Sequence, residues 1–321
     1  MVKILVTGSA GFIGFHTAAR LLRDGQQVVG VDDLNKYYDP KLKKARNKIL
    51  RRNKNYRFYK GDIADYKNLE KIFRREKIRK ICHLAAQAGV RYSRENPFVY
   101  LRSNLHGFVN ILELAHKYKV REIVYASSSS VYGDNKKIPF AETDNVDRPI
   151  SLYAATKKSN ELLAHVYHKL YGLHLVGLRF FTVYGPWGRP DMALFKFTQK
   201  ILAGKPIEVY NRGQMARDFT YIADIVDGIC SALKKTKKIN FAVLNLGNQQ
   251  PEKLTAYIKI LEKHLGRKAK QKLLPLQPGD IPRTCADIRR ARKLLGYRPR
   301  YQLDKGIENF VEWYKSYYRV K

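Results

Sequence analysis

Short apolar runs alternate with amphipathic segments along the first half of the chain. The apolar runs are predicted to be strands, and they cover residues 3–8, 27–33, 56–62, 80–86, 122–128 and 173–180. The amphipathic segments are predicted to be helices over residues 12–24, 40–52, 66–76, 98–118 and 154–171. Strands that are apolar on both faces and alternate with helices are typical of a parallel sheet covered on both sides. We therefore predict an α/β fold built on a doubly wound parallel sheet.

This pattern loosens after about residue 180. Loops that contain Gly and Pro, such as YGPWGRPD and PGDIPR, separate shorter elements there. We predict a first domain over residues 1–180 and a smaller α/β domain that is formed mainly by residues 181–321. Later segments, for example 215–245, are expected to cross back into the first domain.

The charge of the chain is unusual. Its 321 residues include 62 Lys and Arg against 28 Asp and Glu, which gives a formal net charge of +34. Such a charge attracts polyanions at low salt. No helix-turn-helix, zinc-finger or RNA-recognition pattern accompanies it, so we expect a solvated basic surface and no specific nucleic-acid partner. A basic scaffold that binds polyanions is the alternative that lies outside the enzymes.

Three further features bear on compartment and metals. No run of 18 apolar residues is present and the chain opens on a strand-like KILVTG, so neither a membrane span nor a leader is expected. Cys82, Cys230 and Cys285 are far apart and odd in number, which fits neither a disulfide framework nor a zinc site. The histidines show no ligand spacing. We expect a cytoplasmic protein without a metal.

The first candidate chemistry is a glycine-rich turn. KILVTGSAGFIG places Gly8, Gly11 and Gly14 between the first strand and the first helix. Glycines at this point permit a tight turn and let a pyrophosphate approach the backbone N–H groups of the helix N-terminus. The spacing is G-x-x-G-x-x-G rather than G-x-G-x-x-G, but its place in the α/β alternation favours dinucleotide binding.

Acidic residues at the next strand ends indicate which dinucleotide is bound. Asp32 follows Gly14 by 18 residues and ends the second strand, where a carboxylate accepts hydrogen bonds from an adenosine ribose. It would repel a 2′-phosphate, and Asp33 adds to this repulsion, so NAD is favoured over NADP. At the end of the third strand, Asp62 and Ile63 are expected to face the adenine. A helix N-cap is the alternative for Asp62.

A second constellation lies further along. Tyr153 and Lys157 are four residues apart and share one helix face. An ammonium near a phenol favours the phenolate and is expected to lower the pKa of Tyr153, which could then take a proton from an alcohol and return it. Ser128 ends the fifth strand, at the edge of the sheet where ligands bind, and can bond the same substrate oxygen.

TGSAGFIG, Ser128 and YAATK together resemble the extended short-chain dehydrogenases/reductases, the nucleotide-sugar epimerases and dehydratases. HLAAQAGVRYSRENP, SSSSVYG, LRFFTVYGPWGRPDMA, RDFTYI and QPGDIPRTCADI resemble the UDP-glucuronate 4-epimerases over nearly the whole chain. The resemblance implies a Rossmann-like NAD-binding domain followed by a nucleotide-sugar-binding domain. It also implies reversible epimerisation of UDP-glucuronate to UDP-galacturonate through a 4-keto intermediate, with tightly bound NAD recycled in each turnover.

The resemblance implies site residues as well. Besides Tyr153, Lys157 and the residues named above, those expected to line NAD are Phe12, Ile13, Asn35, Leu84, Ala85, Ala86, Gln87, Asn104, Ser127 and Phe180. Those expected to contact the UDP-sugar are Arg91, Ser129, Ser130, Thr182, Arg189, Lys196, Arg217 and Asp280, with Arg283 a weaker candidate. A loop salt bridge is the alternative for Arg189, and a helix N-cap is the alternative for Asp280. Cys285, in RTCADI, stands where the resemblance leads us to expect an aromatic residue.

The serine cluster narrows the chemistry. Related sugar dehydratases typically carry an Asp-Glu pair just before VYG, whereas this chain has Ser129 and Ser130 there. Serine cannot act as that acid or base near neutral pH. The resemblance then implies that chemistry stops at oxidation and reduction of one carbon. The serines, with Thr182 and Arg189, are candidates to hold the uronate carboxylate.

Two questions stay open at this point. A 4-epimerase of neutral UDP-hexoses, or of their N-acetyl forms, is the nearest alternative among the enzymes. The resemblance also suggests a homodimer that is formed through the helices 98–118 and 154–171.

Overall fold

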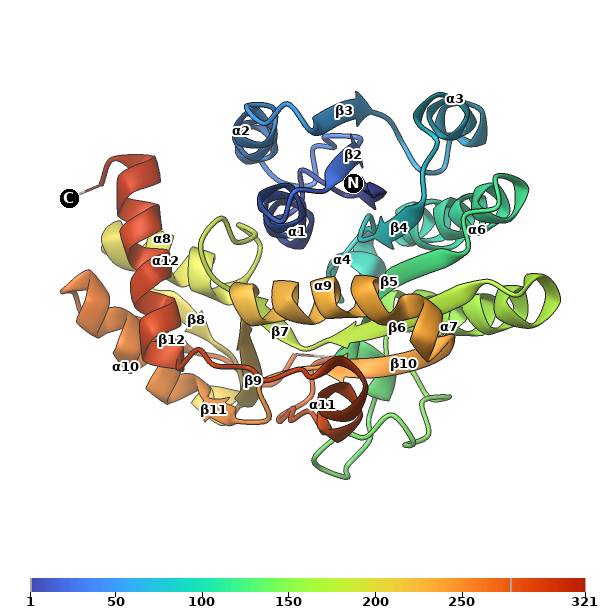
Figure 1. Ribbon diagram of the computed structural model, residues 1–321. Coiled ribbons are helices and arrows are strands. Elements are labelled where there is room, and N and C mark those ends of the chain that lie inside the picture. The colour runs from blue at the N-terminus through green and yellow to red at the C-terminus, as the bar shows by residue number, and fades with distance from the viewer. Residues whose placement is uncertain (1, 278, 321) are drawn as a thin grey trace.

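The main sheet of the computed structural model has seven strands in the order β10-β6-β5-β4-β1-β2-β3 (Figure 1). The model describes residues 2–277 and 279–320. The strands are β1 (Lys3–Thr7), β2 (Gln27–Asp32), β3 (Tyr56–Lys60), β4 (Lys80–His83), β5 (Glu122–Ser128), β6 (His174–Phe180) and β10 (Phe241–Leu246). Every neighbouring pair in this sheet is parallel. The predicted Rossmann-like parallel sheet is therefore confirmed.

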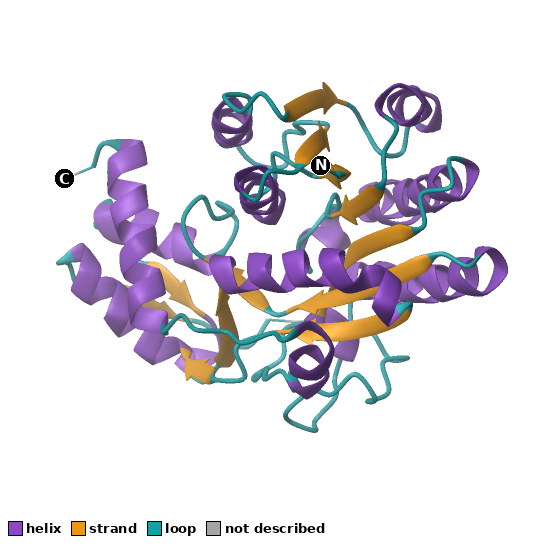
Figure 2. Ribbon diagram, viewed as in Figure 1, coloured by secondary structure: helices purple, strands orange, loops and turns teal. Residues whose placement is uncertain are grey.

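Helices cover both faces of this sheet (Figure 2). On one face lie α1 (Phe12–Arg23), α2 (Pro40–Leu50) and α9 (Ile222–Ile239), whose apolar side chains join one core cluster. On the other face lie α3 (Tyr66–Glu76), α6 (Gly107–Lys117) and α7 (Leu152–Tyr171), whose apolar side chains join a second cluster. This double cover explains why the strands read as continuous apolar runs.

The structure divides one predicted helix. In place of a single helix over 98–118, α4 (Tyr92–Glu95) and α5 (Pro97–Tyr100) lead into a π-helical segment, η1 (Leu101–His106), which continues as α6. Asn96 caps α5, because its side chain accepts a hydrogen bond from the Val99 N–H. The break sits beside the pocket described below, where π-helical turns are often found.

The seventh strand comes from beyond residue 180. After β6 the chain leaves the main sheet and returns through α9 to β10, which pairs with β6. The short helix α11 (Arg289–Leu295) then packs against α9 and β10. The assignment of these segments to two domains with separate roles stays a prediction.

The smaller region lies at the carboxyl ends of the strands. A three-stranded sheet has the order β11 (Pro251–Lys253), β9 (Ala216–Tyr221) and β7 (Thr182–Tyr184), and β12 (Gln271–Leu273) pairs with β8 (Ile207–Val209). The helices α8 (Ala193–Leu202), α10 (Leu254–Leu265) and α12 (Leu303–Tyr318) gather on one side of Figure 1, away from α3, α6 and α7. Short 3-10 turns, η2 (Ser129–Tyr132) and η3 (Tyr210–Gly213), complete the elements. None of the helices in the described ranges combines the length and the apolar character needed to cross a membrane.

Candidate active site

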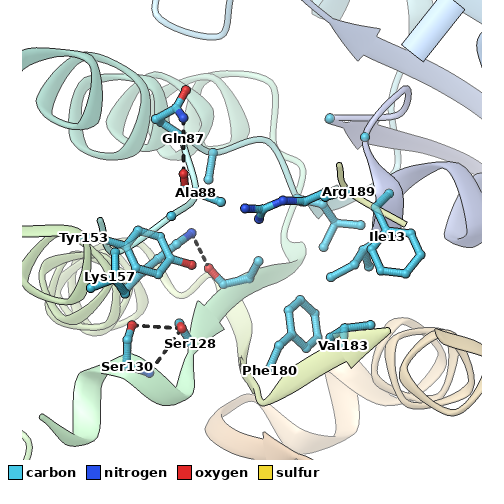
Figure 3. Close-up of a pocket in the computed structure, with 18 of the residues that line it drawn as sticks. Ile13, Gln87, Ala88, Ser128, Ser130, Tyr153, Lys157, Phe180, Val183 and Arg189 are labelled. Carbon is cyan, nitrogen blue, oxygen red and sulfur yellow. Dashed lines mark hydrogen bonds between the residues drawn. The ribbon is translucent and has the colours of Figure 1, made fainter. Parts of the chain in front are cut away.

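A cavity of about 430 Å³ opens at the carboxyl ends of the parallel strands, under the loops of the smaller region. Figure 3 shows its centre, with Tyr153 and Lys157 on one side, Ser128 and Ser130 beside them, and Arg189 extending toward them from the other side. Parallel sheets bind their ligands at this edge. The cavity therefore coincides with the site that the sequence predicts.

The glycine-rich turn forms one end of the cavity. Gly8 has a φ of +69°, and a Cβ there would lie 2.8 Å from the Ala85 nitrogen. A Cβ on Gly14 would lie 2.0 Å from the Gly8 oxygen. Gly11 precedes α1, and no side chain caps this helix. The free N–H groups of the first turn thus face the cavity and fit the pyrophosphate of a dinucleotide.

Asp32 is positioned by the backbone around it. Its carboxylate is 7% exposed and accepts hydrogen bonds from the N–H groups of Ala10 (3.1 Å) and Leu34 (2.9 Å). Burial raises the pKa of Asp32, and the nearby Lys43 ammonium acts against this rise. Lys43, which the sequence reasoning missed, donates to Oδ1 of Asn35 at 2.8 Å. Its place on the inner face of an amphipathic, strongly basic helix was the signal that could have identified it.

The N-cap alternative for Asp62 is wrong. Asp65 caps α3 by accepting a hydrogen bond from the Asn68 N–H, whereas Asp62 pairs with the Arg102 guanidinium at 2.8 Å. Asp62 and Ile63 both line the cavity, at the end where the adenine was expected.

The segment after β4 lines the floor of the cavity with Leu84, Ala85, Ala86 and Gln87. The N–H groups of Leu84 and Ala85 donate to the Thr7 hydroxyl at 3.2 and 3.1 Å. Asn104 exchanges two hydrogen bonds with the Gln87 backbone, at 2.8 and 3.0 Å. Asn104 is buried behind Gln87 rather than on the cavity wall, so it supports the segment that was expected to contact NAD.

Ser128, Tyr153 and Lys157 come together at the centre. Ser128 is the last residue of β5. Helix α7 begins at Leu152 with Ser151 as its cap, so Tyr153 and Lys157 lie in its first two turns. Lys157 donates to the Ala126 carbonyl at 2.8 Å. Burial lowers the pKa of Lys157 to about 8, with the Glu161 carboxylate acting against the shift.

One expectation about this centre is wrong. We expected the lysine ammonium to lower the pKa of Tyr153, but burial raises it. The Ser128 hydroxyl and the positive charge of Arg189 act in the lowering direction, and they do not outweigh burial. The Lys157 ammonium is turned toward the Ala126 carbonyl, which explains why it contributes little to the phenol.

The serine cluster is internally bonded. Ser130 Oγ lies 2.9 Å from Ser128 Oγ, which also accepts a hydrogen bond from the Ser130 N–H at 3.2 Å (Figure 3). Ser129 lines the cavity next to them. Ser127 instead donates its hydroxyl to the buried Glu161 at 2.6 Å, so only its backbone side remains for the cofactor that it was expected to contact.

Arg189 makes the loop salt bridge that was its alternative role, and its contact with a substrate stays a prediction. It lines the cavity together with Thr182, and its Nε and Nη2 both donate to the Asp191 carboxylate. Tyr37 also donates to Asp191, at 3.1 Å. Burial alone would lower the pKa of Arg189, but the Asp191 carboxylate outweighs burial and raises it. The guanidinium thus remains charged inside the cavity.

The remaining substrate candidates divide into two groups. Arg217 and Asp280 line the cavity, and Arg217 donates to the carbonyls of Ala216 and Pro282, both at 3.1 Å. Arg91 pairs with Asp280 at 3.0 Å, but its side chain is half exposed and does not line the cavity. Lys196, on α8, does not line the cavity either. Arg91 therefore reaches the cavity only through Asp280, and Lys196 has no contact that places it at the site.

The other predicted residues line the cavity as expected, namely Phe12, Ile13, Asn35 and Phe180. Further lining residues escaped the sequence reasoning; these are Tyr37, Tyr38, Lys43, Ala88, Gly89, Val90, Ser103, Ser151, Val183, Met192, Gly279, Ile281 and Thr284. Most of them sit in loops with no periodic pattern. In the described part of the chain, no group of three or more metal-ligating side chains stands together.

Known proteins resemble this chain along most of its length. Residues 4–247 match the model of the NAD dependent epimerase/dehydratase family. An uncharacterised protein of Methanocaldococcus jannaschii is 55% identical over 97% of this chain and 96% of its own. UDP-glucuronate 4-epimerase 4 of Arabidopsis thaliana is 50% identical over 99% of this chain and 76% of that protein. The crystal structure of UDP-glucuronic acid 4-epimerase from Bacillus cereus, in complex with UDP-glucuronic acid and NAD, superposes with a TM-score of 0.93 and 37% identity, covering 99% of this chain and 100% of that one.

Proposed function

The chain belongs to the NAD-dependent epimerase/dehydratase family, and from this premise we propose that it interconverts UDP-glucuronate and UDP-galacturonate by inverting carbon 4. One observation carries the proposal. Tyr153 and Ser128 face Arg189 across one cavity, in which serines occupy the positions where a dehydratase would need its acid and base. Such a site favours oxidation and reduction of one carbon in a sugar that carries a negative charge.

NAD fits the other end of the cavity. The glycine-rich turn leaves no space for side chains, the N-terminus of α1 is uncapped, and Asp32 stands where an adenosine ribose would donate its hydroxyls. When bound, NAD accepts a hydride from carbon 4 and returns it to the other face of that carbon. Lys157 is placed to bond the nicotinamide ribose, and Asp32 to bond the adenosine ribose.

In the proposed mechanism Tyr153 moves the proton. The phenol must give up its proton to accept the proton of the sugar 4-hydroxyl, and Ser128 bonds the same oxygen. Because burial raises the pKa of Tyr153, the positive charges around it have to favour the phenolate at the moment of reaction. Tyr153 then returns the proton to the 4-keto sugar once it has turned in the pocket, which completes the inversion.

Arg189 is proposed to hold the uronate carboxylate, with Ser129, Ser130 and Thr182. The 4-keto intermediate is a β-keto acid, which loses carbon dioxide when the breaking bond aligns with the carbonyl π system. A bidentate guanidinium holds a carboxylate in one plane and can prevent this alignment. Arg217 and Asp280 are the proposed contacts of the UDP portion.

The neutral-sugar alternative has one observation in its favour. Nε and Nη2 of Arg189 already donate to Asp191, so a neutral UDP-hexose would leave this ion pair undisturbed. A uronate would have to use the three remaining N–H groups, two on Nη1 and one on Nη2, or displace Asp191. We favour the uronate because Arg189 is only partly exposed (22%), charged and turned into the cavity.

The experiment is to follow purified protein with UDP-glucuronate by proton NMR, with and without added NAD. Growth of UDP-galacturonate without loss of carbon dioxide is expected. A UDP-pentose product would reject the proposed clamp, and conversion of UDP-glucose alone would assign the chain to the neutral hexoses. Inactivity toward every sugar would favour the basic scaffold.

We also propose a homodimer. Leu162, Val166 and Leu170 are 56%, 45% and 68% exposed and lie four residues apart on α7, with Phe98 of α5 77% exposed. A stripe of this kind on a helix is suited to packing against a second copy. Replacing Val166 and Leu170 by Glu should halve the mass in light scattering. An unchanged mass would reject this interface.

A further inference from the structure

Arg46 is a fully buried arginine that has no role in the chemistry above. It lies on the inner face of α2 and is 0% exposed. The ion pairs among the described residues include none with Arg46. Burying a guanidinium without a carboxylate is costly unless hydrogen bonds satisfy it. Its contacts therefore indicate what the arginine is for.

These contacts join two parts of the site. Nη1 donates to the Ala10 carbonyl at 2.9 Å and to the Tyr38 hydroxyl at 2.8 Å. Nη2 donates to the carbonyls of Trp187 (2.6 Å) and Gly188 (3.2 Å). Ala10 belongs to the glycine-rich turn, and Gly188 directly precedes Arg189. One side chain thus bridges the proposed cofactor cradle and the segment that carries the proposed carboxylate clamp.

A second side chain holds the same segment. His16 of α1 lies 2.9 Å from the Pro186 carbonyl through Nε2. Burial lowers the pKa of His16 to about 4, so the ring is neutral at pH 7 and Nε2–H is the donor to that carbonyl. Three consecutive carbonyls, of residues 186–188, are therefore bonded to side chains of α1 and α2. We call Arg46, His16 and these three carbonyls the carbonyl anchor.

The carbonyl anchor fixes a backbone that has little freedom of its own. Trp187 has a φ of +60°, a left-handed conformation that is uncommon for a bulky residue, and its ring packs 5.5 Å from that of Phe15. With the carbonyls of residues 186–188 turned toward α1 and α2, the next side chain, Arg189, extends the other way into the cavity (Figure 3). Its direction depends on these peptide planes as well as on Asp191.

We propose that Arg46, together with His16, is a positioning residue for Arg189: the carbonyl anchor sets the direction from which the guanidinium meets the uronate carboxylate. The inference rests on the proposed function, because it concerns the same clamp. It adds that specificity for the uronate depends on a side chain that does not touch the sugar. A planar fork suits this bridge, because two nitrogens of Arg46 make four hydrogen bonds, whereas a lysine has one nitrogen with three N–H donors.

The first test measures binding to the NAD-loaded Tyr153→Phe variant by calorimetry, with UDP-glucuronate, UDP-glucose and UDP as ligands. Adding Arg46→Lys should weaken the binding of UDP-glucuronate about tenfold, a change of about 1.4 kcal/mol in binding free energy. The binding of UDP-glucose and of UDP should weaken less than about twofold. Lys48→Met is the matched control, since Lys48 is exposed on the same helix. Equal weakening of all three ligands would mean a merely structural role and would overturn the proposal.

The second test is a double-mutant cycle with Arg189→Ala. If Arg46 acts through Arg189, Arg46→Lys should cause no further loss of UDP-glucuronate affinity once Arg189 is gone. Additive losses would overturn the proposal. If Arg46→Lys fails to fold, His16→Phe can replace it, because it removes only the Pro186 contact. This variant should lose less UDP-glucuronate affinity than Arg46→Lys. The loss should again be selective for UDP-glucuronate and absent once Arg189 is gone.

Hydrogen exchange separates this inference from the proposed function. Arg46→Lys should speed the exchange of the backbone amides of Trp187, Gly188, Arg189 and Asp191 in the NAD-loaded protein, and Lys48→Met should not. Unchanged exchange would overturn the positioning role whatever the substrate is. A wild-type protein that binds UDP-glucose as well as UDP-glucuronate would reject the proposed function, and the exchange result would still decide whether Arg46 positions the segment.

Discussion

The two walls of the pocket are built in different ways. On the cofactor wall, Gly8, Asp32 and Ala85 lie at or just beyond the ends of neighbouring parallel strands, and backbone geometry holds them. On the substrate wall, the charged residues Arg189, Arg217 and Asp280 come from segments that are far apart in the chain. There the side chains hold one another, as Arg189 with Asp191 and Arg91 with Asp280.

This difference predicts how substitutions in each wall will affect activity toward the two sugars. The cofactor wall is proposed to contact NAD, and the same NAD serves whether the substrate is UDP-glucuronate or UDP-glucose. A wall of ion pairs can discriminate between sugars, because an incoming carboxylate must share or replace a partner that is already present. Substitutions on the first wall should affect every substrate alike, whereas substitutions on the second should separate UDP-glucuronate from UDP-glucose.

The largest effect is expected where the walls meet. Tyr153→Phe removes the proton carrier and should lower turnover about 1000-fold or more, within the range for a general acid–base. NAD content and UDP-sugar affinity should persist, because neither wall changes. Tyr171→Phe, an exposed tyrosine at the end of the same helix, is the control. Turnover near that of the wild type, measured by NMR, would reject the assignment of Tyr153.

The next largest effect should reveal the discriminating wall. Arg189→Ala should lower kcat/KM for UDP-glucuronate about 10- to 100-fold, the equivalent of losing charge-assisted hydrogen bonds. UDP-glucose should lose only a few-fold. Asp191→Asn, which keeps the shape but releases the guanidinium from its carboxylate, should not weaken UDP-glucuronate. If Arg189→Ala lowered kcat/KM equally for UDP-glucuronate and UDP-glucose, the substrate wall would not discriminate between the two sugars.

A smaller and non-discriminating effect is expected on the cofactor wall. Asp32→Asn removes the charge and one of the two acceptor oxygens, so only one of the N–H groups of Ala10 and Leu34 keeps its partner. NAD affinity should fall about tenfold, and the preference for NAD over NADP should shrink, because the repulsion of a 2′-phosphate is reduced. Titration of cofactor-free protein measures both. If Asp32→Asn lowered turnover of UDP-glucuronate and of UDP-glucose by different factors, the two walls would not be independent.

The smallest effect concerns pH. Burial lowers the pKa of Lys157 from 10.5 to about 8, so the folded protein releases this proton near pH 8 and the unfolded chain holds it to about 10.5. Between these values the unfolded state binds more protons, and the contribution of Lys157 to stability rises with pH. Turnover should instead fall above pH 8, because a neutral amine bonds the Ala126 carbonyl and the nicotinamide ribose more weakly than the ammonium does.

Melting curves and turnover at pH 7 to 10 distinguish these trends. Lys157→Met should abolish the rise in stability that this group contributes, and its low residual turnover should lose the alkaline limb. A different outcome is that melting temperature and turnover fall together above pH 8, with the same pH dependence in wild type and Lys157→Met. General unfolding would then explain the alkaline loss of turnover.

The same contrast explains what could be predicted from the sequence. The strands of the first half of the chain, the glycine-rich turn and the placement of Asp32 follow from local rules, since strand periodicity and glycine sterics act over a few residues. The helix 98–118 was expected to be continuous, and its π-helical segment could not be foreseen, because the register shift depends on packing against the pocket rather than on any local signal.

The substrate wall was harder to predict for a physical reason. The pairing of Arg91 with Asp280, and the carbonyl contacts of Arg46, join residues that are far apart in the sequence, so their proximity depends on the folded chain. The pKa of Tyr153 was misjudged for the same reason: spacing places Lys157 on the same helix face but does not show that its ammonium turns to the Ala126 carbonyl. Types of residue were predictable there, and their partners were not.

The central claim is that chemistry is confined to carbon 4, and an isotope experiment tests it most directly. UDP-glucuronate that carries deuterium at carbon 4 would be converted in ordinary water, and unlabelled UDP-glucuronate in heavy water, with both products examined by NMR. The account predicts UDP-galacturonate that retains deuterium at carbon 4 in the first case and acquires none on carbon in the second. Loss of that label, or deuterium entering carbon 5, would show acid–base chemistry on carbon and contradict the account.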